Sequence, residues 1–216
     1  EMVIEGFPPA MRDIARKRLE KENWDYVRKL GIIQECIYGI DIQSIAVQIS
    51  KLRFFISLLV EQTEKPGEPN RGFDPLPNLD FKLVAANTLI GAPESDIVEG
   101  GMFEDDFFDK FDKLTTEYFN KYLPNEKEKL KNEIITLIDN KIEEKKKDIL
   151  REIELKKSKK EIETWQQQID LWDSYAKLFK HESVGFFEPK YFFPKTKNGF
   201  DIVIGNPPYV VTKKGT

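Results

Sequence analysis

A long stretch without glycine or proline, between Pro124 and Gly185, most constrains how this chain can fold. Lys and Glu dominate it, and both residues favour helices. Its second half carries apolar residues at alternating steps of three and four, the spacing of a seam between two packed helices: Ile162, Trp165, Ile169, Trp172, Ala176 and Phe179. We therefore predict that residues 104–183 are helical and that both tryptophans are core residues rather than base-stacking residues.

Two antiparallel helices are expected within this region. A similar apolar stripe lies upstream, at Leu130, Ile134, Leu137 and Ile138. Ser158 with Glu161 three residues later is typical of a capping box at a helix start, so we expect the two helices to meet near residues 155–157. The lysines at 145–147 and 156–160 are expected on a solvated face. The alternative is a contact with DNA phosphates, which would make DNA affinity depend on salt.

Strands alternate with helices on both sides of the helical region. We expect a helix from Met11 to Leu30 that ends at Gly31, a buried strand at 36–41, a helix at 44–61, a loop at 64–80, a strand at 81–85 and a buried strand at 200–204. The helix at 44–61 is largely apolar and carries Ile45, Ile49, Leu52, Ile56 and Leu59 at helical spacing. This alternation predicts an α/β fold with an open, mostly parallel sheet.

Three polar residues mark the carboxyl ends of the expected strands: Asp41, Asn87 and Asn206. Ligands of open α/β sheets bind at the carboxyl ends of the strands. The three residues are therefore the first candidates for a functional site.

The turn at residues 205–209 has the groups that methyl transfer to a conjugated amine requires. The lone pair of such an amine, adenine N6 for example, is delocalised, so two fixed acceptors are needed to draw its N–H bonds out of the ring plane. The Asn206 side chain offers one acceptor, and the neighbouring carbonyl, fixed by Pro207 and Pro208, offers the other. Tyr209 can stack on a base flipped out of a duplex. Such acceptors stabilise charge that develops on the nitrogen, without a strong base.

Three segments resemble a known family. Residues 200–210 (FDIVIGNPPYV) resemble the catalytic motif of N6-adenine DNA methyltransferases. Residues 37–60 (IYGIDIQSIAVQISKLRFFISLLV) are similar to the stretch after the S-adenosyl-L-methionine (SAM) motif of type IIG restriction–modification enzymes and related phage-defence (BREX-type) methylases. Residues 79–91 (LDFKLVAANTLIG) resemble the next motif of those enzymes.

The resemblance implies a partial Rossmann-like, SAM-dependent methyltransferase sheet with a long, charged helical insertion. Its first part would cover residues 1–103, the insertion 104–183 and the catalytic-loop part 184–216. The parent protein would act on double-stranded DNA with a flipped adenine.

The resemblance also implies the roles of individual residues. Asp41 would bind the ribose hydroxyls of SAM, and Ile42 would pack on its adenine. Asn87 would lie near the cofactor adenine, and Leu89 would also belong to the cofactor-binding site. Asp41 could instead cap the helix that follows it, and Asn87 could instead cap its own loop.

Several motifs of the family are expected outside this sequence. The glycine-rich SAM loop should precede Glu1, and a later aromatic motif should follow Thr216. We therefore expect this chain alone to bind SAM weakly or not at all. The DNA recognition sequence, any nuclease activity and the oligomeric state stay open.

Composition narrows the class of protein further. No apolar run is long enough to span a bilayer, and no signal peptide is visible, so we expect a cytoplasmic protein. Cys36 is the single cysteine, expected to be a small buried group, and His181, the single histidine, is expected at the surface. Asp105 and Asp106 lack partners at a metal-like spacing, and we predict no metal site. The net charge of −4 argues mildly against DNA binding, although a local basic patch is compatible with it.

Two alternatives to a DNA-adenine enzyme stay open. Methyltransferases that act on protein glutamine or RNA guanine also use Asn-Pro-Pro-Tyr, but usually with a short connection before it. Here more than 100 residues separate Asn87 from Asn206, which favours the DNA enzymes. The other alternative is a non-catalytic module that binds a partner through its helical hairpin.

Overall fold

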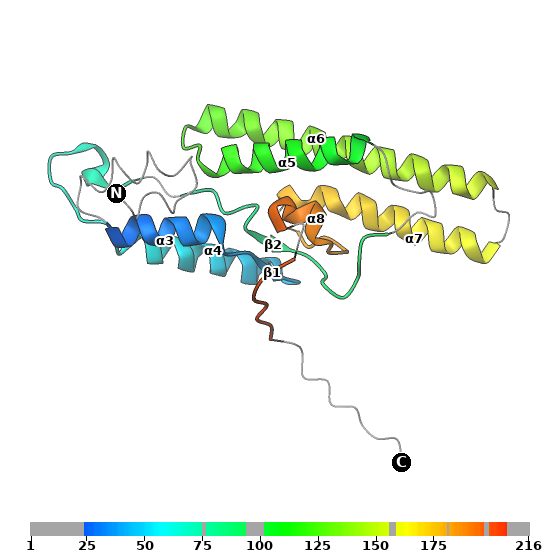
Figure 1. The fold of residues 1–216 in the computed structure, drawn as a ribbon, viewed down its shortest axis with the longest axis horizontal. Helices are drawn as coiled ribbons and strands as arrows, with labels where there is room; N and C mark the ends of the chain where they lie inside the picture. The colour runs from blue at the N-terminus through cyan, green and yellow to red at the C-terminus, as the bar shows by residue number, and fades with distance from the viewer. Residues whose placement is uncertain are drawn as a thin grey trace, which may run out of the picture.

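The computed structural model describes residues 24–74, 77–93, 102–155, 159–180, 182–196 and 199–206. Its elements, in order, are α3 (Trp24–Glu35), β1 (Gly39–Asp41), α4 (Ser44–Leu59), η1 (Pro69–Gly72), β2 (Leu83–Ala85), α5 (Met102–Phe119), α6 (Pro124–Leu155), α7 (Lys159–Tyr175), η2 (Ala176–Lys180), α8 (Pro189–Phe192) and η3 (Pro194–Thr196). Most of the described chain is therefore helical (Figure 1).

The described sheet is small and parallel. β1 pairs with β2, with Gly39 opposite Leu83 and Asp41 opposite Ala85. Beyond β2, Ala86 forms a parallel bridge with Val184, so a third segment runs alongside the two strands. The expected parallel α/β arrangement is thus present coarsely, as two short strands and one bridge. β1 is also shorter than predicted and only partly buried.

Helices α5, α6 and α7 lie side by side along the molecule (Figure 1). α6 and α7 run antiparallel, as predicted, and residues 156–158, which include Ser158, lie outside the described residues. The predicted apolar positions face inward: Trp165, Trp172, Leu130, Ile134 and Ile138 are all buried. The sequence interpretation did not separate α5 as a third helix. The bounds predicted for the three domains stay a prediction.

Aromatic rings join the helical region to residues 184–192, which follow it in the chain and which we call the return segment. Trp172 lies 5.2 Å from Phe186 and 5.1 Å from Tyr191, measured between ring centroids. Tyr175 packs 5.4 Å from Phe192 in an edge-on arrangement. Each such pair contributes about 0.5–1.5 kcal/mol beyond the burial of its surface, so the return segment is firmly attached to α7.

A second core lies between α3, α4 and β2, and Gly31 does not end the first helix as predicted. α3 continues through Gly31 to Glu35. A glycine inside a helix costs about 1 kcal/mol relative to alanine, and burial of Leu30 and Ile33 on either side of it offsets that cost. The part of the predicted helix before Trp24 lies outside the described residues.

The apolar stripe of α4 faces away from this core. Val47, Lys51 and Leu58 are the buried residues of the helix. The five residues that the helical spacing singled out are each 45–62% exposed: Ile45, Ile49, Leu52, Ile56 and Leu59. We call these five residues the α4 stripe. A stripe of this size is uncommon on a solvent-facing helix.

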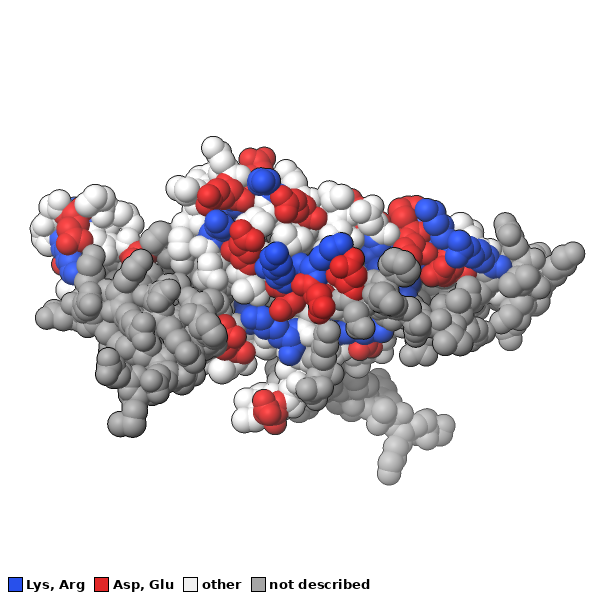
Figure 2. Space-filling view, turned by 45° about the horizontal axis from the view of Figure 1, so that its top comes forward, with Lys and Arg blue, Asp and Glu red and all other residues white. Residues whose placement is uncertain are grey.

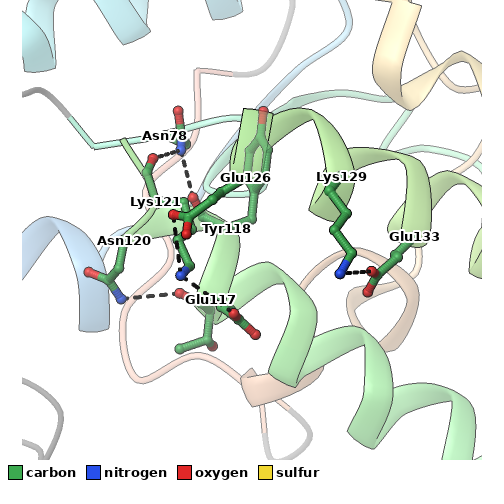
Figure 3. A network of polar contacts seen from close by, with 9 residues as sticks. Asn78, Glu117, Tyr118, Asn120, Lys121, Glu126, Lys129 and Glu133 are labelled. Atoms are coloured by element: carbon green, nitrogen blue, oxygen red, sulfur yellow. Dashed lines mark hydrogen bonds and ion pairs between the residues drawn. The ribbon is translucent and has the colours of Figure 1, made fainter. Parts of the chain in front are cut away.

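Asn78 fixes the end of α5 to the loop before β2. Its side-chain nitrogen donates hydrogen bonds to the Tyr118 carbonyl at 2.6 Å and to the Lys121 carbonyl at 2.8 Å. Carbonyls at a helix end lack hydrogen-bond donors within the helix. The Asn78 side chain supplies a donor for both of these carbonyls. Around this contact, Lys121 pairs with Glu126 at 3.5 Å (Figure 3).

Charges of both signs are mixed on the face of the molecule shown in Figure 2. On the face in Figure 2, Lys and Arg are interleaved with Asp and Glu, without an extended basic area. The prediction that the lysines at 145–147 lie on a solvated face is wrong for Lys145, which is only 4% exposed. It continues the seam of Ile138, Ile142 and Ile149 at steps of four and three, so its stem packs inward. Cys36, predicted to be buried, is exposed.

Candidate functional site

Asp41 and the segment carrying Asn87 lie next to each other at the carboxyl end of the small sheet. Asp41 is the last residue of β1 and is paired with Ala85, two residues before Asn87. The amide of Ala86 donates to the Asp41 carbonyl at 3.0 Å, which continues the ladder beyond the strands. Neighbouring strands are about 4.8 Å apart, so the two predicted site residues belong to one small region.

The Asp41 carboxylate is exposed and forms a local turn. Its Oδ1 accepts a hydrogen bond from the Gln43 amide at 2.7 Å. Gln43 is the residue that caps α4, and no side chain caps the helix start directly. Asp41 therefore stabilises the turn before α4, but it is not the helix cap that the alternative interpretation proposed. A carboxylate has about four acceptor sites, so this contact leaves it able to accept hydrogen bonds from a ligand.

Asn87 also forms a turn of its own. Its Oδ1 accepts from the Leu89 amide at 3.0 Å, and its carbonyl accepts from the Ile90 amide at 3.4 Å. The turn leaves the Leu89 side chain 88% exposed. Ile42, on the neighbouring strand end, is 59% exposed. Ile42 and Leu89 thus expose apolar side chains close in the chain to Asp41 and Asn87.

Residues 200–204 do not form the predicted buried strand. Ile202, Val203 and Ile204 are 79%, 80% and 92% exposed. Phe200 still packs at 5.9 Å from the Tyr38 ring, but the segment after it runs away from the body (Figure 1). An apolar strand becomes buried only when it pairs beside another strand, and no strand of the described residues pairs with it.

Asn206, the last described residue of this segment, is exposed. The other predicted catalytic residues, Pro207, Pro208 and Tyr209, lie outside the described residues, as does His181. The structure therefore brings together the predicted site residues at the ends of β1 and β2, while most of the predicted catalytic turn lies outside the described residues.

Two of the groups with shifted pKa values lie at the amino ends of the strands, opposite the candidate site. Tyr38 and Lys82 directly precede the two strands, and the Lys82 ammonium lies 3.9 Å from the centre of the Tyr38 ring. Burial lowers the pKa of Lys82 to about 8 and, with help from Glu35 and Asp112, raises the pKa of Tyr38 to about 12. Both residues line a cavity of about 40 Å³ with Asp112 and Lys195. This cavity is separate from the candidate site.

The sequence interpretation missed the residues that hold the Asn87 turn from the other side. The Asn87 amide donates to the Val184 carbonyl at 3.0 Å, and the Phe187 amide donates to the Ile90 carbonyl at 2.8 Å. The only sequence signal for them is the short apolar run after the helical region, from Val184 to Phe187. Within the described residues, no group of three metal-ligating side chains comes together. No helix in the same part of the chain is both long and apolar enough to cross a membrane.

Comparison with known proteins identifies the family of this chain. Residues 35–216 match the model of the Eco57I restriction-modification methylase family. The chain is also similar to a protein described as a putative type II restriction enzyme and methyltransferase, RM.MjaORFECS2P, from Methanocaldococcus jannaschii. The two are 39% identical over 74 residues, which is 34% of this chain and 6% of the relative. No solved structure matches the chain significantly. Because the family match covers both strand ends, the helical region and the Asn206 turn, the chain belongs to the Eco57I restriction-modification methylases.

Proposed function

We propose that this chain is part of a cytoplasmic, site-specific DNA methyltransferase that transfers the methyl group of SAM to adenine N6. The parent protein would serve a type IIG restriction–modification or related phage-defence system. The observation that carries the proposal is the pairing of Asp41 with Ala85, two residues before Asn87, at the carboxyl end of parallel strands. That edge is where open α/β sheets bind nucleotide-like ligands.

The residues at this edge fit the nucleoside part of SAM. Asp41 retains acceptor capacity beyond its hydrogen bond to Gln43, which suits the two hydroxyls of a ribose. Ile42 and Leu89 are exposed beside it, which suits the flat faces of an adenine. Asn87 uses its oxygen within its own turn, so its side-chain nitrogen is the group that we assign to a ring acceptor.

The chemical step in this proposal belongs to the turn at Asn206. SAM, when bound, supplies a methyl group on a good leaving group, so the chain has only to orient the acceptor. The Asn206 oxygen and the Pro207 carbonyl would accept hydrogen bonds from the two N6 protons, and Tyr209 would stack on the flipped base. Pro208 would keep the Pro207 carbonyl fixed.

The exposed apolar segment before Asn206 is consistent with a larger parent sheet. Strands buried on both faces are nearly continuous runs of apolar residues, and Ile202 to Ile204 is such a run. The relative that the chain matches is far longer than the chain, which spans 6% of its length. We infer that residues outside this sequence complete the sheet and bring Asn206 to the SAM edge.

Methyl transfer by the full-length protein tests the proposal. The protein is incubated with DNA and SAM labelled in the methyl group, and the DNA is digested to nucleosides. We expect label in N6-methyladenine, its loss in Asn206→Ala, and its retention in Asn132→Ala, which removes an exposed amide of α6.

Other outcomes point to the alternatives. Label in protein or RNA would favour a glutamine or guanine methyltransferase. A folded full-length protein that transfers no methyl group to DNA, RNA or protein would favour an interaction module.

A further inference from the structure

The Asn87 turn is held by the segment that returns from the helical region, at both of its ends. On the near side, the Val184 amide donates to the Ala85 carbonyl at 2.9 Å, and the Val184 carbonyl accepts from the Asn87 amide at 3.0 Å. On the far side, the Phe187 amide donates to the Ile90 carbonyl at 2.8 Å. Three main-chain hydrogen bonds therefore bracket the turn, and all three come from residues 184–187.

The return segment is in turn fixed to α7. The Gly185 amide donates a hydrogen bond to the Ser174 hydroxyl at 2.8 Å, and that hydroxyl donates to the Leu171 carbonyl at 2.6 Å. The backbone passes so close to α7 that a Cβ on Gly185 would lie 2.9 Å from Leu171 and 3.1 Å from the Ser174 oxygen. The side chain of Phe186, next in the chain, is fully buried in the aromatic core.

A continuous series of contacts thus runs from α7 to Asn87. It begins at Ser174, passes through the backbone of Gly185 and Val184, and ends at the Asn87 amide. Asn87 itself is in an exposed turn with one side-chain hydrogen bond. Without the return segment, the turn would depend on its own two local hydrogen bonds, which are weak constraints on a loop.

We propose that the Ser174–Gly185 contact is a positioning device through which the helical region sets the conformation of the Asn87 turn for cofactor binding. The inference rests on the proposed function, because it assigns the turn to the nucleoside of SAM. Ser174 and Gly185 are positioning residues that touch no substrate. The helical region then contributes to affinity for SAM, not only to the spacing between two motifs.

Ser174→Ala and Gly185→Ala test the device in the full-length protein. The first removes the acceptor of the Gly185 amide, and the second places a methyl group 3.1 Å from the Ser174 oxygen, which crowds the contact. In each variant we expect the KM for SAM to rise threefold to tenfold, while kcat at saturating SAM and the KM for DNA change less than twofold. Because both substitutions act on one contact, the double variant should show little more than either single change.

Thr136→Ala is the matched control, since within the described part of the chain the Thr136 hydroxyl bonds to the Asn132 carbonyl of its own helix and to no other element. It should leave the KM for SAM unchanged. A lower kcat with an unchanged KM in Ser174→Ala would show a merely structural role and overturn the proposal. If Gly185→Ala does not fold, Ser174→Ala and its control still decide the question.

Hydrogen–deuterium exchange separates this inference from the proposed function. The amides of Asn87 and Ile90 should exchange threefold to tenfold faster in Ser174→Ala than in Thr136→Ala, whether or not SAM is present. Unchanged exchange would refute the contact as a positioning device while leaving the methyltransferase proposal intact. A wild-type protein without methyl transfer would instead refute the proposed function, and with it the cofactor role of the turn.

Discussion

Lys51 of α4 and Asp80, in the loop before β2, form an ion pair of 2.7 Å in which the lysine side chain is 9% exposed and the carboxylate 33%. The second carboxylate oxygen accepts a hydrogen bond from the Tyr118 hydroxyl at 2.9 Å. Asp80 thereby joins α4, which packs on the small sheet, to α5 of the helical region.

Asp80→Ala should destabilise the chain by about 2–3 kcal/mol, because it leaves the Lys51 ammonium buried without its partner. A fully buried pair typically gives 3–5 kcal/mol, and solvent access to Asp80 reduces this. Urea unfolding of the 216-residue chain measures the change. Asp106→Ala, which breaks the exposed pair with Lys110, should change stability by less than about 1 kcal/mol. Equal effects of the two variants would contradict the prediction.

The chain should also become less stable in acid, because the Asp80 carboxylate is protonated there. Burial acts to raise its pKa, but the charge of Lys51 and the hydrogen bonds from Lys51 and Tyr118 outweigh it, so the pKa lies below its ordinary value of 3.8. A depressed carboxyl pKa gives stability that is present above the unfolded-state pKa and is lost as the pH falls through the folded-state pKa. Melting temperatures at pH 3 and pH 7 should therefore differ less in Asp80→Asn than in the wild-type chain.

Lys145 should make the chain more stable in mild alkali. Burial, with the nearby charge of Lys190, lowers its pKa to about 8 from an ordinary 10.5. Between these values the unfolded chain binds more protons than the folded chain, so the free energy of unfolding rises with pH. Lys145→Met should reduce this rise between pH 8 and 10 by about 1 kcal/mol. Lys129→Met, at an exposed position of the same helix, should leave the rise as it is.

The α4 stripe should tolerate charge where the opposite face of the helix does not. Ile49→Glu and Ile56→Glu, both at exposed positions, should change the free energy of unfolding by less than about 1 kcal/mol. They should also reduce self-association of the isolated chain in sedimentation velocity, because exposed apolar patches drive association. Val47→Glu, on the buried face of α4, should unfold the chain. A large loss of stability in Ile49→Glu would show that the stripe packs against this chain itself.

Asn78→Ala should weaken the attachment of α5. It removes two hydrogen bonds to the Tyr118 and Lys121 carbonyls, and we expect a loss of about 1–2 kcal/mol. Asn120→Ala is the control, because within the described residues the Asn120 side chain, just after α5, bonds to the Thr116 carbonyl of that helix and not to another element. Thermal unfolding of both variants measures the difference, and a loss in Asn120→Ala as large as in Asn78→Ala would count against the interpretation.

The sequence predicted the structure best where local spacing decides burial. Trp165 and Trp172 are buried because a seam at steps of three and four faces one side of any helix. The same periodicity could not tell that the α4 stripe faces outward, since spacing defines a face but not what covers it. Nor could composition show that Lys145 occupies a seam position.

The candidate site was predictable only in part, for a similar reason. Asp41 and the Asn87 segment are neighbours because parallel strands end at a common edge, which the order of elements implies. Val184 was not found, because its pairing partner lies far away in the sequence and no local pattern marks it. Residues 202–204 were predicted to be buried from their composition, whereas burial of a strand depends on the neighbour that pairs with it.

The bridge between Ala86 and Val184 also bears on how the chain folds. Ala86 and Val184 are 98 positions apart in the sequence, whereas Gly39 and Leu83 of the β1–β2 pair are 44 apart. Closing the longer loop as a flexible chain costs about 0.7 kcal/mol more entropy. Helices α5 to α7 turn most of this loop into rigid rods that pack against one another, which shortens the effective distance to be closed. We expect the helical hairpin to form early from local contacts and the third parallel segment to join the sheet last.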